Sequence, residues 1–438
     1  MRVFILVWFG QLVSLLGSGI TRFSLGIWVY QETGSVTQFS LISLFAMLPS
    51  ILLSPLAGVF VDRWDRRWTM IFSDSGAGLS TLTMGLLILA GRFEVWHIYL
   101  AVAVSSTFNA FQLPAYAATT TLLVPKQHLG RASGMVQTAE ATSHLLSPIL
   151  AGVLVVTIQI QGVILIDFLT FVFAAIALLL ARFPKPKITV EAQVGKGLLL
   201  HEAIYGWTYI STRPGLLGLL MFFATSNFLI GVVSVLFTPL VLSFTSATVL
   251  GTMFSLSGIG MLLGSLVMSA WGGIKHRIHS VLGFTLLNGL CILLGGLQPS
   301  VPVFFVAAFI YFFGVAVINS SDRAIWQSKV PLAVQGRVFA MRTMLAWASV
   351  PLAYLMAGPL ADRVFEPLLA VGGPLAGSIG RIIGVGKGYG IALLFVAIGI
   401  LTILMVVGGY LYLPLRLLEN QLPDAIINEA SPTEENER

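Results

Sequence analysis

The chain has 438 residues, of which 57% are hydrophobic and only 10% are charged. Ordinary soluble domains carry about 25% charged residues, so this composition excludes a water-soluble globular fold. The net charge is +6, and the single cysteine, Cys291, excludes an intrachain disulfide and a zinc cluster built on thiolates. We therefore expect a protein embedded in a lipid bilayer.

The apolar residues fall in runs long enough to cross a bilayer as helices. A transmembrane helix needs about 20 mostly apolar residues, and no run shows the strict alternation of a β-barrel strand. The first run begins at Val3 and is too long for a signal peptide, so we expect it to be retained. The predicted fold class is an all-α membrane protein with twelve transmembrane helices at 3–30, 38–61, 68–90, 95–123, 132–158, 162–182, 215–242, 248–271, 280–297, 302–321, 337–360 and 389–413.

A long polar stretch divides these helices six and six. It contains Pro184-Lys185-Pro186-Lys187, and its second part, 198–210, has few charges and favours an amphipathic helix on the membrane surface. The predicted domains are an N-terminal six-helix half, a cytoplasmic linker, a C-terminal six-helix half and a cytoplasmic tail, at 1–182, 183–214, 215–413 and 414–438.

The basic residues are distributed unequally between the two sides of the predicted bundle. Most of the 24 lysines and arginines lie on the side of the N-terminus. Only Arg92, Arg363, Arg381 and Lys387 lie in segments on the other side. The positive-inside rule therefore predicts that both termini are cytoplasmic, and the basic residues are expected to meet lipid headgroups and not nucleic acid.

The two halves share short sequence repeats. Val124-Pro125 followed by Gly130-Arg131 recurs as Val330-Pro331 followed by Gly336-Arg337, with the same internal spacing. The two copies precede the fifth helix of each half. Duplicated halves are common in transporters, which bind substrate between them, so the repeat favours a pseudo-symmetric bundle.

The loop after the second helix carries the most specific motif. The loop contains a glycine (Gly58), then an Asp-Arg pair (Asp62-Arg63) and then a basic pair (Arg66-Arg67). This pattern resembles the signature of the major facilitator superfamily. The Asp-Arg-x-Asp-Arg-Arg form is similar to the branch with macrolide exporters and the enterobactin exporter. The resemblance implies a charge latch on the cytoplasmic side; the alternative is a basic loop that only fixes orientation. The predicted latch comprises Gly58, Asp62, Arg63, Asp65, Arg66, Arg67 and Asp74.

The fifth helix contains Ser147-Pro148 and Ala151-Gly152, which resemble the Gly-Pro-x-x-Gly-Gly element of proton-coupled drug exporters. Ser147 and Ala151 replace two of its glycines, but small residues and a helix-bending proline remain. The resemblance implies a role in export. Ordinary packing between helices is the alternative.

Charged side chains within the bilayer are costly and therefore functional candidates. Glu140 and His144 share a face of the fifth helix with Gln137 and Ser147. Glu140 and His144 are the predicted site of proton coupling, because burial favours the neutral form of a carboxylate and an imidazole can share its proton. The alternative is a structural Glu–His bond that holds this helix to a neighbour.

Arg22 in the first helix and Asp167 in the sixth are predicted to pair near the outer side, where they could gate the path or orient a substrate. Uncharged polar side chains in other predicted helices are expected either to line a cavity or to bond between helices. These cavity candidates are Asn109, Gln112, Tyr116, Gln137, Asn227 and Asn319.

The resemblance implies a secondary transporter in a bacterial plasma (inner) membrane. We predict a monomeric, proton-coupled exporter of amphiphilic or hydrophobic small molecules, driven by the proton gradient without a cofactor or metal. A lipid or lysolipid transporter and a nutrient importer are the alternatives within transport. An enzyme is not expected, because the predicted helices lack a convergent catalytic set, and a receptor would leave Glu140 and His144 without a dynamic role.

Overall fold

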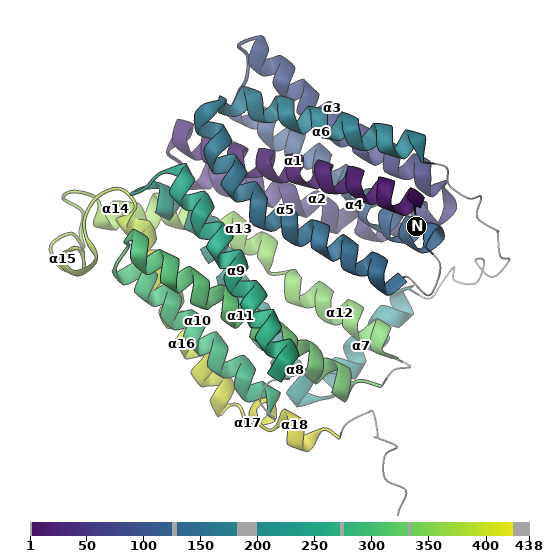
Figure 1. Ribbon diagram of the computed structural model, residues 1–438. Coiled ribbons are helices and arrows are strands. Elements are labelled where there is room, and N and C mark those ends of the chain that lie inside the picture. The colour runs from purple at the N-terminus through teal and green to yellow at the C-terminus, as the bar shows by residue number, and fades with distance from the viewer. Residues whose placement is uncertain (1, 125–128, 182–198, 272–275, 332–333, 424–438) are drawn as a thin grey trace, which may run out of the picture.

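The computed structural model describes residues 2–124, 129–181, 199–271, 276–331 and 334–423, and it is helical in every part that has regular structure (Figure 1). The helices begin and end close to the predicted runs, because each apolar run satisfies its own backbone as a helix. The N-terminal half consists of α1 (Arg2–Thr33), α2 (Val36–Arg63), α3 (Arg66–Leu89), α4 (Val95–Leu123), α5 (Leu129–Thr157) and α6 (Gln159–Leu180).

The C-terminal half repeats the arrangement with more breaks. A short helix precedes it, at the place predicted for an amphipathic helix: α7 (Leu199–Ser211). The long helices are α8 (Pro214–Leu242), α9 (Ala247–Trp271), α10 (Arg277–Leu297), α11 (Val301–Lys329), α12 (Gln335–Trp347), α13 (Val350–Pro359) and α16 (Tyr389–Leu411). The short elements are η4 (Leu360–Phe365), α14 (Glu366–Leu369), α15 (Gly380–Ile383), α17 (Leu413–Arg416) and α18 (Leu418–Gln421).

Among the described residues, 11 helical stretches are long and apolar enough to cross a membrane. The fourth predicted span forms a helix, α4, but is not one of these 11, so a count of twelve remains a prediction. The eleventh predicted span was drawn as one helix at 337–360. In the structure most of this stretch belongs to one candidate membrane span, Met341–Leu369. The helix is interrupted within the span between α12 and α13, because Pro351 in the first turn of α13 has no backbone N–H to continue the ladder.

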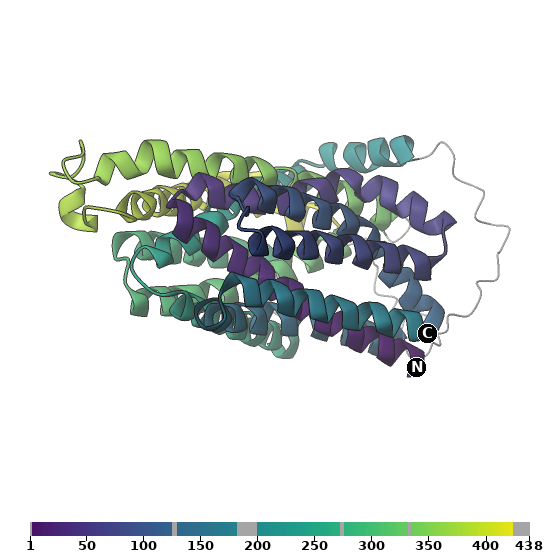
Figure 2. The same ribbon diagram turned by 90° about the horizontal axis from the view of Figure 1, so that it is seen from above.

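The two ends of the bundle differ in how the halves meet. The linker end holds the start of α1, the end of α6 and the start of α8, whereas the joined end holds the start of α2, the end of α13 and the start of α16. The halves converge at the joined end and their ribbons diverge toward the linker end (Figure 1), and Figure 2 shows α14 and α15 far from the N-terminus.

Backbone contacts hold the halves together near the joined end. A Cβ atom on Gly152 of α5 would lie 2.7 Å from the carbonyl oxygen of Ala247, at the start of α9. A Cβ atom on Gly251 would lie 2.5 Å from the carbonyl oxygen of Pro148. Only glycine permits this approach of α5 to α9, because a larger side chain would push one backbone away from the other.

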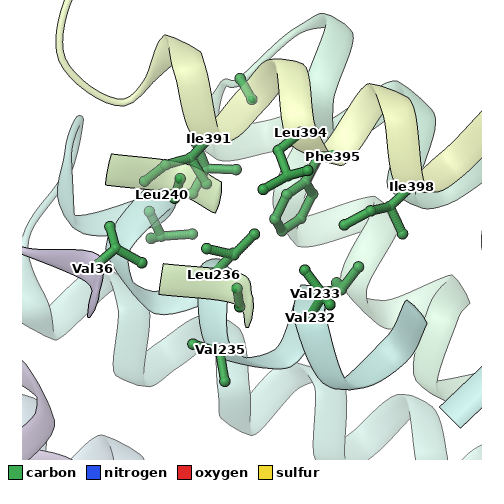
Figure 3. Packing of buried hydrophobic residues seen from close by; sticks show 14 of the residues in the cluster. Val36, Val232, Val233, Val235, Leu236, Leu240, Ile391, Leu394, Phe395 and Ile398 are labelled. Atoms are coloured by element: carbon green, nitrogen blue, oxygen red, sulfur yellow. The ribbon is translucent and has the colours of Figure 1, made fainter. Parts of the chain in front are cut away.

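A buried apolar cluster, the joining cluster, extends from the C-terminal half across the joined end to the N-terminal half. Its members include Ile27, Tyr30 and Val36 from α1 and α2, together with side chains of α8, α9, α13 and α16. Figure 3 shows Val36 at the margin of this cluster, beside residues of α8 and α16. Apolar packing thus closes the bundle at this end.

Candidate functional site

A cavity of about 670 Å³, the central cavity, lies between the two halves. Its walls come from α1, α2 and α5 of the N-terminal half, and from Thr238, Phe254 and Tyr354 of α8, α9 and α13. The volume is within the range of small-molecule sites, about 300 to 1,000 Å³. Phe23 and Phe254 meet across the halves, edge to face at 5.4 Å, and join the walls.

Glu140 and His144 both line the central cavity, as expected from their shared helix face. The alternative of a direct Glu–His bond is not seen: no hydrogen bond or ion pair within 4 Å joins these two described side chains. His144 is exposed to the cavity and Glu140 is partly exposed. The pair therefore presents one acid and one base to whatever occupies a largely apolar space.

Arg22 also lines the central cavity, and it borders a second, smaller cavity inside the N-terminal half. Its predicted partner, Asp167, is close enough to interact with it electrostatically. However, no ion pair within 4 Å joins these two described residues. The carboxylate of Asp167 instead accepts hydrogen bonds of 3.2 Å from the hydroxyls of Ser18 and Thr81, which corrects the direct pairing.

The second cavity, the N-half cavity, has a volume of about 230 Å³ and is lined by α1, α2, α3, α4 and α6. Asp74 lines it and accepts a hydrogen bond of 2.9 Å from the side-chain amide of Gln11. The side-chain amide of Gln112 in turn donates to Gln11. Asp74 was predicted to support the cytoplasmic latch, but the structure places it in this buried network, because its helix face turns into the bundle.

The predicted latch is only partly visible. The surroundings of Gly58 and the side chains of Asp62, Arg63 and Arg66 lie outside the described part of the structure. Asp65 caps the N-terminus of α3 by accepting from the backbone amides of Arg67 and Trp68. Arg67 donates to the carbonyl oxygens of Leu178 and Leu179 at the end of α6. Asp65 therefore stabilises the start of α3, and Arg67 fastens α3 to α6 within the N-terminal half.

The other polar candidates have different surroundings. Asn109 and Gln112 line the N-half cavity, whereas the hydroxyl of Tyr116 is buried without a hydrogen-bond partner among the described residues. Asn227 donates to the carbonyl oxygen of Ala346 and so joins α8 to α12. Asn319 is exposed and lines neither cavity, and the side chain of Gln137 lies outside the described residues.

The small-residue motif of α5 packs against three neighbouring helices, α1, α6 and α9. Ser147 donates a hydrogen bond to the carbonyl oxygen of Leu16, and Ala151 is fully buried beside α1 and α6. Pro148 and Gly152 face α9 across the halves. The motif thus lies at the joint between the halves, next to Glu140 and His144.

Sequence reasoning missed the carboxylate that bridges the halves at the joined end. Asp362 in η4 accepts hydrogen bonds from the backbone amides of Val36 and Thr37, and from the hydroxyl of Ser35. Only the free amides at the start of α2 hint that an acceptor is needed there. Sequence alone does not show which distant residue supplies it.

The family to which this chain is similar fits a fold with two halves around a central cavity. Residues 7–354 match the sequence profile of the Major Facilitator Superfamily. The chain belongs to the major facilitator superfamily. This confirms the resemblance and the fold class, and the chain is a multi-pass membrane transporter. Superfamily members bind small-molecule substrates, and nothing in the comparisons points to catalysis.

Relatives of this chain include proteins that are named as efflux proteins. Macrolide efflux protein A of Streptococcus pyogenes is 27% identical over 366 residues, which cover 82% of this chain and 90% of the relative. The multidrug efflux pump Tap of Mycolicibacterium fortuitum is 26% identical over 373 residues, which cover 82% of this chain and 89% of the relative.

Solved structures show the same fold at low identity. A bacterial homologue of the human lysosomal transporter Spinster, in an inward-facing, unoccupied conformation, has a TM-score of 0.70 at 13% identity, with 95% of this chain and 96% of that chain covered. A point mutant of the nucleoside transporter NupG has a TM-score of 0.73 at 10% identity, with 93% of this chain and 99% of that chain covered.

Proposed function

We propose that this superfamily member is a proton-coupled exporter of amphiphilic or hydrophobic small molecules, which works by alternating access as a monomer in a bacterial inner membrane, without a cofactor. The observation that carries this proposal is the central cavity, where Glu140, His144 and Arg22 are set in largely apolar walls. Such a site suits a molecule with an extended apolar body and one polar or charged group. The names of the relatives, macrolide and multidrug efflux proteins, support export.

The arrangement of the ends supports alternating access. With both termini in the cytoplasm, the linker end is the cytoplasmic end and the joined end faces outward. The structure is then an inward-facing state, with its outer end closed by the joining cluster and by Asp362. Opening the joined end while closing the linker end would move the central cavity from one side of the membrane to the other.

A proton can supply the driving force through Glu140 and His144. Moving one charge through 100 mV supplies about 2.3 kcal/mol, which supports a concentration ratio of roughly 50-fold. Glu140 takes up a proton or attracts a cationic substrate, but a single carboxylate does not serve both at once. Competition at Glu140 therefore couples entry of the proton to exit of the substrate.

Transport of a macrolide or of tetraphenylphosphonium by inside-out vesicles tests this proposal. We expect the wild type to accumulate the probe under an imposed pH gradient and to lose accumulation when the gradient is collapsed. In Glu140→Gln, the concentration ratio of the probe across the vesicle membrane should fall close to one. Glu94→Gln removes an exposed carboxylate at the start of α4 and should keep the ratio of the wild type.

Two results would contradict the proposal. Gradient-driven accumulation that survives Glu140→Gln would place the coupling elsewhere in the chain. No movement of any amphiphilic probe by the wild type, together with movement of a lysolipid or of a nutrient into the cell, would favour one of the alternative transport functions.

A further inference from the structure

The N-half cavity lies inside one half of the transporter, beside the central cavity between the halves, and carries a group of polar side chains. All its walls belong to the N-terminal half, and amides and hydroxyls line it, among them Gln11, Gln112, Asn109, Ser105 and Thr81. Its volume of about 230 Å³ is large enough to hold several water molecules. The polar side chains around this space could bind water or another polar guest within the bilayer.

Two carboxylates of this cavity are almost completely buried without an ion pair among the described residues. Asp74 is 8% exposed and Asp167 is 5% exposed. Their hydrogen-bond donors in the described part of the chain are neutral, namely the amide of Gln11 for Asp74 and two hydroxyls for Asp167. Burying a charged carboxylate without a cationic partner is costly, and either a bound proton or hydration lowers the cost.

The C-terminal half provides a contrast. Its buried carboxylate, Asp322, is 2% exposed and forms an ion pair with Arg342. The guanidinium of Arg342 directly offsets the charge of that carboxylate. Asp74 and Asp167 have no such partner in the described structure, so their charge is free to change.

Two unsatisfied polar atoms lie at the same cavity, beside the two carboxylates. The hydroxyl of Thr21, a residue only 5% exposed, has no hydrogen-bond partner at acceptable geometry, although it lies near Asp167. The side-chain oxygen of Gln112 is also buried without a partner. Both residues line the N-half cavity, so both atoms are positioned to bond a guest with donors and acceptors, such as water or hydronium.

The two carboxylates lie toward opposite ends of the bundle. Asp74 is in the third turn of α3, about 12 Å from its start at the linker end, and Asp167 is about 12 Å from the start of α6 at the joined end. The N-half cavity lies against both residues. A proton could therefore pass along water within it, between the inner and outer parts of the membrane.

We propose that the N-half cavity is a hydrated proton-binding site, with Asp74 and Asp167 as its protonatable groups, and that Arg22 links it to the central cavity. The proposal rests on the proton coupling of the proposed function. It adds a site for the proton that is separate from Glu140. A hydronium ion loses one O–H bond, a carboxylate oxygen gains one, and water is left, so the step needs no other reactant.

Arg22 gives this site a way to act on the substrate. Its side chain borders both cavities, with Asp167 on one side and Glu140 and His144 lining the other cavity. When Asp167 is ionised, it attracts the guanidinium toward the N-half cavity. When Asp167 is protonated the attraction is lost, and the positive charge of Arg22 acts on the central cavity, where it repels a cationic amphiphile held by Glu140.

Among the described residues, few charged and titratable groups lie around Asp167. Arg22 faces it from α1, and Asp74 lines the same cavity from α3. Glu140 and His144 act on it only across Arg22, from α5. Protonation of Asp167 is expected to depend on these four groups.

Infrared spectroscopy of the purified protein in lipid tests the site directly. We expect the wild type to show the carbonyl stretch of a buried, protonated carboxyl that disappears as the pH is raised. Asp167→Asn and Asp74→Asn should each remove part of this band, and Glu94→Gln should leave it unchanged. Unchanged bands in both Asn variants would overturn the proposal, whatever their effect on transport.

Transport assays separate coupling from folding. In proteoliposomes, Asp167→Asn should lose accumulation of tetraphenylphosphonium under a pH gradient and keep its exchange across the membrane without a gradient, because exchange needs no net proton movement. Full accumulation by both Asn variants would overturn the proposal. So would a carboxyl band that responds to Na⁺ at constant pH, because the site would then bind a metal cation.

The two proposals fail in different ways. A wild type that moves the probe without any dependence on the pH gradient contradicts the proposed function. The infrared band still decides whether the N-half cavity binds a proton, because it is measured without substrate and without a gradient.

Discussion

The carboxylate of Asp362 accepts a hydrogen bond of 2.8 Å from the backbone amide of Thr37, so a residue of the C-terminal half caps a helix of the N-terminal half. It also accepts from Val36 at 3.0 Å, and both amides belong to the first turn of α2, whose N–H groups have no partner within the helix. A negative charge is favourable at this end of a helix dipole. This contact closes the joined end and must break for that end to open.

Removing this cap should favour the state in which the joined end is open. Loss of a helix cap costs about 1 to 2 kcal/mol, so Asp362→Ala should shift the equilibrium by roughly 5- to 30-fold toward opening. Spin labels at Gln31 and Arg363, which are both exposed on opposite halves, would report the change as a longer distance population. The single native cysteine, Cys291, would first be replaced by serine.

Two comparisons make this result specific to the cap. Val364→Ala changes an exposed neighbour of Asp362 in η4 and should leave the distance distribution unchanged. If Asp362→Ala and Val364→Ala gave the same distribution as the parent protein, the hydrogen bonds to α2 would have no part in holding the end closed.

Gly358 should be intolerant of even one methyl group. A Cβ atom there would lie 2.3 Å from the Cα atom of Thr37, so Gly358→Ala must push α13 from α2. Overpacking of this kind costs about 1 to 3 kcal/mol, and the thermal stability of the purified protein should fall. Gly283→Ala, in α10, meets nothing within 4 Å and should keep or raise stability, because alanine favours helix by about 1 kcal/mol. Equal melting temperatures for the two variants would contradict the close contact.

The buried ion pair of the C-terminal half should be needed for stability. Arg342→Met leaves the carboxylate of Asp322 buried without its partner, which typically costs about 3 to 5 kcal/mol. The double variant Asp322→Leu with Arg342→Met removes both charges and should recover much of the loss. Arg323→Gln, at an exposed neighbouring position, should have little effect. A double variant as unstable as Arg342→Met in thermal unfolding would mean that the pair does more than neutralise its own charges.

The positions of the helices followed from the sequence because the bilayer imposes a local rule. A backbone in hydrocarbon must satisfy its own hydrogen bonds, so each long apolar run had to form a helix, and α1 and α16 begin and end near the predicted runs. The common cavity of Glu140 and His144 was also predictable, because residues one turn apart share a helix face. Both inferences needed only neighbouring residues.

The partners of the charged residues were decided by the tertiary structure. Asp74 is expected at the latch but accepts a hydrogen bond from Gln11. Asp167 accepts hydrogen bonds from hydroxyls, and Arg22 lies nearby without a hydrogen bond to it. Asp362 accepts a hydrogen bond from Thr37 in the other half. Hydropathy does not reveal these relationships, because the lipid-facing and protein-facing sides of a membrane helix are both apolar. The sequence by itself therefore determined the helices, their division into halves and the family. Only the packing of one helix against another decided which polar groups meet, because those contacts join residues far apart in the chain.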